Sequence, residues 1–278
     1  MTFSVEKNVT KKLRKASEQW ILDRSTFARI MEKSGVSKMG KWKQVQEYAN
    51  HIPSPLEHYL RNKDKVSGIL LLDATFTKVK GQGIAVIIAY DTEVGVIDYW
   101  IDSTENKTAY SYIFQRLNKV GYRVKCVVSD GHFSILPILK EKKLPHQRCV
   151  IHLLRELKRK MVKRDFAELT GRNKILYSRI KGIFRTSNIE YLPERINFFR
   201  QRTEPLFANR KSILDWFWQV LPSAVLHLSY EEKVPCSTNL LENLNGQIKA
   251  RLKTMRGMKS EKSLHNLLKI LFYFRKYK

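Results

Sequence analysis

The spacing of apolar residues changes twice along the chain, and the changes divide it into parts. Over residues 5–22 apolar side chains recur at helical spacing among lysines, which predicts a first helix. The runs 66–72, 83–90 and 95–101 are instead β-branched or aromatic and have the length of strands. From residue 152 to about 228 the spacing is helical again. The pattern predicts a sheet flanked in the sequence by helical segments.

A crossover is expected after the third strand. Ser103 can cap a helix that extends to Val120, and this helix returns to a fourth strand at 123–129. A short helix, 134–143, and a fifth strand, 146–151, follow. Three strands, a helix and a fourth strand imply a mixed sheet, so the expected fold class is α/β.

Two short helices, 27–33 and 38–49, are expected around a turn at Gly35, and Ser37 can cap the second helix. This is the pattern of a helix-turn-helix, whose second helix enters the major groove of DNA with its N-terminal residues first. The candidate DNA-binding residues here are Ser37, Lys38, Lys41, Lys43 and Gln44. The alternative is an ordinary helical hairpin that does not contact DNA.

The chain is strongly basic. Its 278 residues include 52 Lys and Arg against 26 Asp and Glu, a formal net charge of +26. Residues 146–278 carry 28 basic and 11 acidic side chains, whereas residues 66–145 carry 10 and 8. Such a balance favours nucleic acid as the partner, although lysines and arginines that coat solvated helices are the plainer alternative.

Other function classes are disfavoured by what the sequence lacks. No run of about 18 apolar residues and no signal-peptide order is found, so we expect a soluble protein that does not bind membranes. Cys126, Cys149 and Cys236 are too scattered for a disulfide framework. We therefore expect a reducing compartment, namely the cytoplasm and nucleoid of a prokaryote or the nucleus of a eukaryote.

Three carboxylates, far apart in sequence, are the candidate chemistry. Asp73 ends the apolar run 69–72, Asp130 ends the run 126–129, and Glu242 lies in the first turn of a predicted helix. Carboxylates that converge repel one another, and they stay ionised by holding divalent cations. Two Mg²⁺ or Mn²⁺ ions about 4 Å apart are suited to displacement at a phosphodiester.

Each carboxylate also has an ordinary explanation. Aspartate ends many strands, and Glu242 would stand at the third helical position of a capping box if Asn239 were the N-cap. The polar stripe of Glu242, Asn245 and Lys249 continues past the cap, beside an apolar stripe of leucine and isoleucine. That helix would lay Asn245, Lys249, Arg251 and Lys253 along DNA.

The order of these motifs resembles the Mutator-like transposases and their prokaryotic insertion-sequence relatives over residues 66–260. The matching blocks are Asp73, Ser129-Asp130-Gly131-His132, the Cys-x-x-His element of Cys149 and His152, and the run Asn239-x-x-Glu242-x-x-Asn245. The resemblance implies an RNase H-like core with an Asp-Asp-Glu triad of Asp73, Asp130 and Glu242, interrupted by a helical insertion. It also implies metal-dependent cleavage at transposon ends, followed by attack of a 3′-hydroxyl on target DNA.

The resemblance also implies the partners, whereas the domain order follows from the resemblance together with the residue pattern, because the short N-terminal helix-turn-helix departs from the larger DNA-binding region of many family members. The partner is double-stranded DNA, as terminal inverted repeats and as target, and joining two ends needs a homodimer or a larger assembly. The expected domains are a helix-turn-helix domain (1–60), a linker (61–65), the first part of the core (66–152), an α-helical insertion (153–230), and the Glu242 helix with basic C-terminal helices (231–278).

Two further pairs have open roles. By spacing alone Cys149 and His152 favour a buried structural pair, because two ligands are too few for zinc, and no zinc is expected. Trp216 and Trp218 are candidates for stacking on an unpaired base, with core packing as the alternative. Two other functions stay open: a domesticated, inactive DNA-binding regulator, and an RNase H-like nuclease that does not transfer strands.

Overall fold

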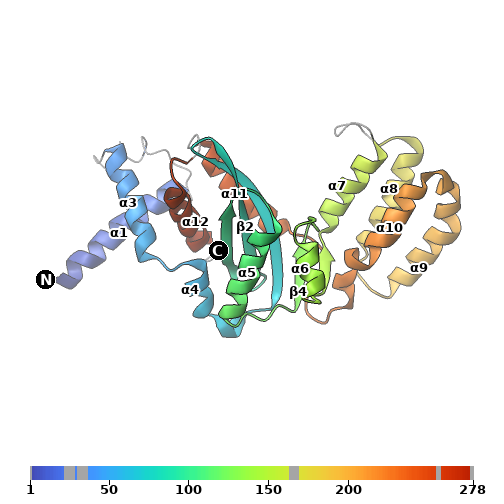
Figure 1. The fold of residues 1–278 in the computed structure, drawn as a ribbon, viewed down its shortest axis with the longest axis horizontal. Helices are drawn as coiled ribbons and strands as arrows, with labels where there is room; N and C mark the ends of the chain where they lie inside the picture. The colour runs from blue at the N-terminus through green and yellow to red at the C-terminus, as the bar shows by residue number, and fades with distance from the viewer. Residues whose placement is uncertain (1, 22–28, 30–36, 163–168, 255–257, 276–278) are drawn as a thin grey trace. The chain divides into compact units, whose positions relative to one another are not determined.

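The computed structural model describes residues 2–21, 29, 37–162, 169–254 and 258–275. Most of the first helix and the turn of the expected helix-turn-helix lie outside the described residues. Figure 1 shows the order of the elements along the chain. They belong to two compact units: Met1–Ser67, Ala74–Arg123 and Leu240–Lys278 form the first, and Gly68–Asp73 and Val124–Asn239 form the second.

The sheet has five strands in the order β3-β2-β1-β4-β5. The strands are β1 (Ile69–Val79), β2 (Gln82–Asp91), β3 (Gly95–Asp102), β4 (Cys126–Ser129) and β5 (His146–Arg148). β2 and β3 are antiparallel, whereas β1 with β4 and β4 with β5 are parallel. The expected mixed sheet in an α/β fold is therefore confirmed.

Four predicted strand boundaries are wrong. β1 begins at Ile69 and not at residue 66, and β4 begins at Cys126 and not at residue 123. β1 does not end at Leu72 but continues to Val79, because Thr75 is buried and Phe76 exposed in the alternation of a half-buried strand. β5 ends at Arg148, three residues before the predicted Ile151. The apolar residues that follow it recur at helical spacing and form the buried face of the next helix, α7 (Val150–Met161).

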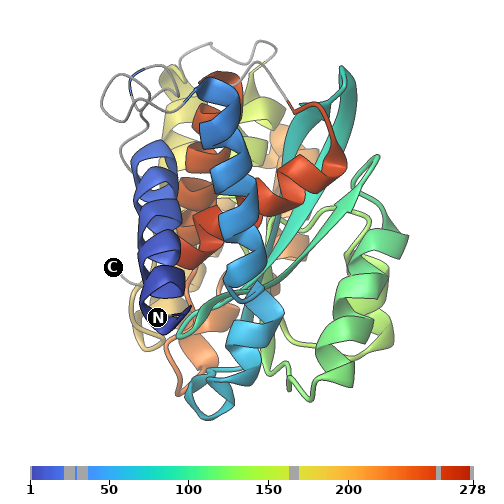
Figure 2. The ribbon, with the colours of Figure 1, turned by 90° about the vertical axis from the view of Figure 1, so that its left-hand side faces the viewer.

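The helices of the first unit are α1 (Thr2–Ile21), α3 (Lys38–His51), α4 (Pro55–Leu60), α5 (Lys107–Lys119), α11 (Asn239–Thr254) and α12 (Glu261–Arg275). α1, α3 and α12 pack against one another, as Figure 2 shows. Trp20 meets Trp42 edge to face at 5.6 Å between ring centroids, and Tyr48 stacks on Phe274. Aromatic side chains therefore join the N-terminal helices to the C-terminal one.

The helix caps follow the predicted chemistry at one position and differ at another. Ser37 caps α3 as predicted, because its Oγ accepts a hydrogen bond from the backbone N–H of Gly40 (3.1 Å). α5, however, begins at Lys107 with Asn106 as its cap, not at the predicted Ser103. The side chain of Asn106 accepts from the N–H of Ala109, whereas Ser103 bonds to Asp102.

The second unit contains the start of β1, β4, α6 (Leu136–Glu141), β5 and a long helical segment that begins with α7. This helical segment continues with α8 (Gly171–Phe184), α9 (Tyr191–Phe198), the short turns η2 (Phe199–Thr203) and η3 (Glu204–Arg210), α10 (Lys211–Ala224) and η4 (Leu226–Ser229). Its core is formed by the apolar faces of α7, α8 and α10, with Phe184 and Phe217 fully buried. The predicted helical character of residues 152–228 is confirmed where the structure describes them.

Candidate catalytic site

The strands β1 and β4 are parallel, so Asp73 and Asp130 follow them in the same direction. Leu71 pairs with Val128; Asp73 lies two residues further along β1, and Asp130 is the residue that follows the end of β4 at Ser129. Neighbouring strands lie about 4.8 Å apart, and side chains two residues apart in a strand share a face of the sheet. Both aspartates are half-buried. Both aspartates belong to the second unit, and the charges of both act on the imidazole of His152.

The backbone after Asp130 is held in a tight turn. The carboxylate of Asp130 accepts a hydrogen bond from the N–H of His132 (2.9 Å), and Gly131 between them has a φ of +81°. A Cβ at Gly131 would overlap the guanidinium of Arg148. Glycine is needed here for two reasons: the left-handed backbone and the close approach of Arg148.

Arg148 connects this turn to the helical segment. Its Nη2 donates to the carbonyl oxygen of Asp130 (3.3 Å) and to Oε2 of Glu156 (3.2 Å) on α7. The other oxygen of Glu156 accepts from the indole N–H of Trp216 on α10 (2.7 Å). The sequence did not predict this network. The glycine beside Asp130 is the one residue in the sequence that hints at it. Arg148 and Glu156 lie on a strand and on a helix, so no repeating spacing links the two residues.

Cys149 and His152 lie beside the two aspartates. Cys149 is buried where β5 gives way to α7, and its Sγ accepts hydrogen bonds from the N–H and the hydroxyl of Thr238 (both 3.4 Å). Burial raises the pKa of the Cys149 thiol, but the hydrogen bonds with His152 and Thr238 together lower it by more. The pKa of Cys149 is therefore below its usual value.

The pKa of His152 responds to the same neighbours. Its hydrogen bond with Cys149 raises the pKa and burial opposes this, while the charges of Cys149, Asp73 and Asp130 raise it further. The imidazole therefore senses the negative potential of both aspartates. The burial of Cys149 and its bonds to Thr238 agree with the structural pair that spacing favoured.

Glu242 lies in the first turn of α11. The helix already includes Asn239, so Glu242 is its fourth residue and not the third, where a capping box would need it. Thr238, which immediately precedes α11, is the residue that bonds to Cys149. The start of the helix is thus tied to the loop that follows β5.

Two of the four residues on α11 that were predicted to contact DNA are buried, and two are exposed. Asn245 and Arg251 are each only 5% exposed. The Arg251 guanidinium lies 4.7 Å from the ring centroid of Trp20, and burial lowers its pKa to about 10. Lys249 and Lys253 are exposed, as a phosphate contact requires. Arg251 therefore stabilises the packing of α11 on α1 rather than lying on the surface.

The predicted contacts on α3 divide in the same way. Ser37, Lys38 and Lys43 are exposed, whereas Gln44 is half-buried. Lys41 is only 8% exposed, so its expected place on the surface of the helix is wrong.

The two tryptophans proposed for base stacking are used in packing. Trp216 is 8% exposed, belongs to the core of the helical segment and donates its indole N–H to Glu156. Trp218 is half-buried, donates to Glu204 (3.1 Å) and has Arg200 over its ring. The structure therefore favours packing over the stacking role for both residues.

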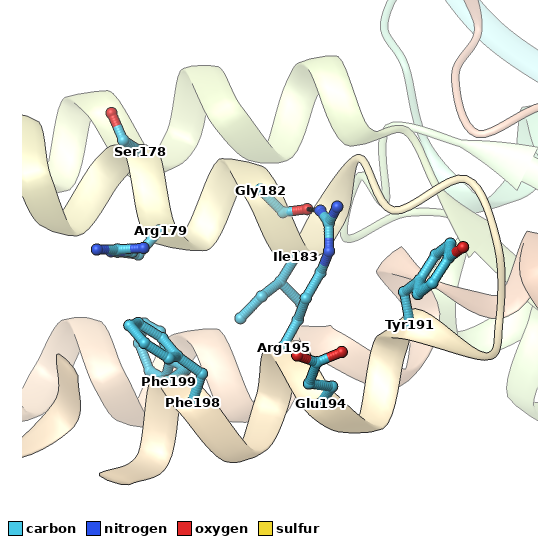
Figure 3. Close-up of a pocket in the computed structure, with 9 residues that line it drawn as sticks. All are labelled: Ser178, Arg179, Gly182, Ile183, Tyr191, Glu194, Arg195, Phe198 and Phe199. Carbon is cyan, nitrogen blue, oxygen red and sulfur yellow. Dashed lines mark hydrogen bonds between the residues drawn. The ribbon is translucent and has the colours of Figure 1, made fainter. Parts of the chain in front are cut away.

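A hollow of about 480 Å³ lies between α8 and α9 (Figure 3). Its arginines are already engaged: Arg195 donates to the carbonyl of Gly182 (2.6 Å), and Arg179 lies over the ring of Phe198. Glu194 is the one carboxylate that lines it. This hollow therefore does not offer the paired carboxylates found at Asp73 and Asp130.

The chain matches the model of the family "Transposase, Mutator family" over residues 26–277. It belongs to the Mutator family of transposases. The transposase of insertion sequence IS905 from Lactococcus lactis is 27% identical over 220 residues, which cover 73% of this chain and 53% of that protein. The transposase of IS256 in transposon Tn4001 from Staphylococcus aureus is 25% identical over 214 residues, or 72% and 52%.

A third relative, the transposase of IS1201 from Lactobacillus helveticus, is 23% identical over 243 residues, which cover 82% of this chain and 63% of the relative. This Mutator-family chain spans about half the length of the IS905 and IS256 transposases. None of its described helices is both long and apolar enough to cross a membrane.

Proposed function

We propose that this chain forms the RNase H-like catalytic core of a DNA transposase, with Asp73, Asp130 and Glu242 as its metal-binding triad. The observation that carries the proposal is the parallel register of β1 and β4, which runs from the Leu71–Val128 pair toward Asp73 and Asp130, together with the charge of both aspartates at His152. The family match supports it, because the chain aligns with transposases over nearly its whole length.

The aspartates suit Mg²⁺ or Mn²⁺. Both cations prefer oxygen ligands, and two half-buried carboxylates near one imidazole offer them. The pKa of His152 is raised mainly by its hydrogen bond with Cys149, and the charges of Asp73 and Asp130 add to that rise. Two bound ions would activate the attacking oxygen and stabilise the leaving one at a phosphodiester.

The residues around the aspartates position them. The N–H of His132 fixes one carboxylate oxygen of Asp130, and Arg148 fixes its carbonyl. Glu242 is proposed as the third ligand because α11 begins directly after Thr238, which is bonded to Cys149 in the loop that follows β5. In that role its oxygens would complete the set of hard ligands.

The proposed substrates are the terminal inverted repeats of a mobile element and a target duplex. Cleavage at an end frees a 3′-hydroxyl, which then attacks a phosphodiester of the target. Two ends must be joined in one event, so the proposed active form has at least two copies of the chain. The exposed lysines of α3 and α11 would bind the DNA backbone.

The test is cleavage of a labelled duplex that carries the terminal repeats of the element encoding this protein. With Mg²⁺ or Mn²⁺ the protein is expected to nick the repeat ends and to yield products joined to a target plasmid. Cleavage without joined products would support a nuclease that does not transfer strands. Specific binding of the repeats without any cleavage would support a DNA-binding regulator and would contradict the proposal.

A further inference from the structure

A groove of about 1010 Å³ lies on the first unit between the β1–β2 hairpin and the end of α11. Five lysines line it: Lys78 and Lys80 from the hairpin, Lys249 and Lys253 from α11, and Lys259 from the segment after α11. All five are exposed. The chain therefore presents lysines from both walls of one groove.

The backbone of the groove is fixed by pairing between its walls. Val79 and Met258 form a parallel bridge, in which the N–H of Lys80 donates to the carbonyl of Met258 (2.8 Å) and the N–H of Met258 donates to that of Lys78 (3.3 Å). Leu252 and Met258, which also line the groove, are buried. This backbone pairing holds Lys78 and Lys80 against the segment that carries Lys259.

The charge of the groove is of one sign. None of its lining residues is acidic, and none of the five lysines forms an ion pair with another residue that the structure describes. Five cations gathered without counter-charges repel one another, and a row of phosphates relieves that repulsion. Phe76, which is 56% exposed, adds an apolar contact at the rim.

We propose that this groove binds the sugar-phosphate backbone of duplex DNA through Lys78, Lys80, Lys249, Lys253 and Lys259. The proposal rests on the proposed transposase function, which makes DNA the polyanion that the protein meets. It adds the β1–β2 hairpin and the segment after α11 to the DNA-binding surface. The contacts carry no base specificity, because lysine binds phosphate as a point charge.

The test compares two triple variants of the full chain that lose the same charge. The groove variant is Lys78→Gln, Lys80→Gln and Lys253→Gln. The control variant is Lys119→Gln, Lys140→Gln and Lys142→Gln, three exposed lysines on α5 and at α6. Binding of a fluorescent 20-base-pair duplex of arbitrary sequence is followed by anisotropy in EDTA at several salt concentrations.

Each lost phosphate contact lowers the slope of log K against log salt by about 0.9. The groove variant is expected to lose about 2 to 3 from the slope and the control variant less than 1. A third variant, with arginine at the three groove positions, preserves the charge and should keep the wild-type slope. Equal slopes for the groove and control variants, with both folded by circular dichroism, would overturn the proposal.

The result is separable from the fate of the proposed function, because binding in EDTA needs no catalysis. If the groove variant has a reduced slope but the protein never cleaves DNA, the groove proposal stands and the proposed catalytic function fails. If the groove and control variants have equal slopes and the protein does cleave DNA, only the groove proposal fails. If an acidic peptide competes for the groove while the DNA slopes stay equal, the partner is a protein and the proposal fails.

Discussion

The guanidinium of Arg148 donates a hydrogen bond to the backbone carbonyl of Asp130 and fills the space that a side chain at Gly131 would need. A residue at the end of β5 therefore sets the backbone beside a proposed metal ligand at the end of β4. The same guanidinium bonds to Glu156, so the geometry of the Asp130 turn depends on the packing of α7. These contacts would hold Asp130 in place for the proposed metal ion.

Replacement of Gly131 by alanine is expected to destabilise the protein more than replacement of Gly121. Both glycines have positive φ, +81° and +78°, so both variants carry the cost of a left-handed alanine, about 1–2 kcal/mol. Only at Gly131 does the new methyl group meet another side chain, that of Arg148. The lost hydrogen bonds of Arg148 should add about 1–3 kcal/mol. Urea unfolding of both variants measures the difference, and equal losses would contradict the packing described for Arg148.

Trp216→Phe is expected to lower stability without a specific loss of DNA binding. The substitution removes the hydrogen bond from the indole N–H to Glu156, which should cost about 1–3 kcal/mol because the acceptor is charged and partly buried. The affinity for DNA with an unpaired base should stay within about twofold of wild type, because Trp216 packs in the core and does not stack on a base. Loss of a stacked base would instead cost about 1–3 kcal/mol. Thermal unfolding and anisotropy measure the two quantities. A tenfold loss of affinity at unchanged stability would restore the stacking role.

Asp98 is expected to make the protein less stable as pH rises toward neutrality. Burial raises the pKa of its carboxyl to about 6, although the charge of Arg116 and the N–H of Tyr99 act to lower it. A carboxyl whose folded pKa lies above its unfolded value contributes full stability below the unfolded pKa, and it loses that contribution as pH rises through the folded pKa.

The Asp98→Asn variant provides the comparison, because asparagine does not titrate. Between pH 4 and pH 7 the stability of wild type relative to this variant should fall by on the order of 2–3 kcal/mol. Urea unfolding of both proteins at several pH values measures it. A constant difference across that range would show that Asp98 titrates normally.

The elements that sequence predicts well are those whose signal is local. The apolar runs before Asp73 and Asp130 predict two strands, and the helix between them predicts a parallel pair, which the register confirms. The end of β5 could not be found in this way. The apolar residues after Arg148 are compatible with either a strand or a helix. They form a helix because it buries them in the core of the helical segment.

The burial of charged residues is what the sequence predicts least well. Arg251 was expected on the surface because its neighbours Lys249 and Lys253 are there. Its place in the core depends on Trp20, 231 positions earlier in the chain, and no local pattern signals that contact. The Arg148 network is likewise not signalled by any local pattern, since Arg148, Glu156 and Trp216 lie on three different elements, β5, α7 and α10.

The central claim is that Asp130 holds a catalytic metal ion, and a change of ligand chemistry tests it most directly. In Asp130→Cys a softer thiolate replaces the carboxylate, which should disfavour Mg²⁺ more than Mn²⁺. Cleavage of the terminal-repeat duplex by this variant is expected to be lost in Mg²⁺ and to recover in part in Mn²⁺. Asp215→Cys, at an exposed aspartate of α10, should cleave like wild type in both metals. If Asp130→Cys cleaved like wild type in Mg²⁺, or if the folded variant showed no recovery in Mn²⁺, the assignment of Asp130 would be contradicted.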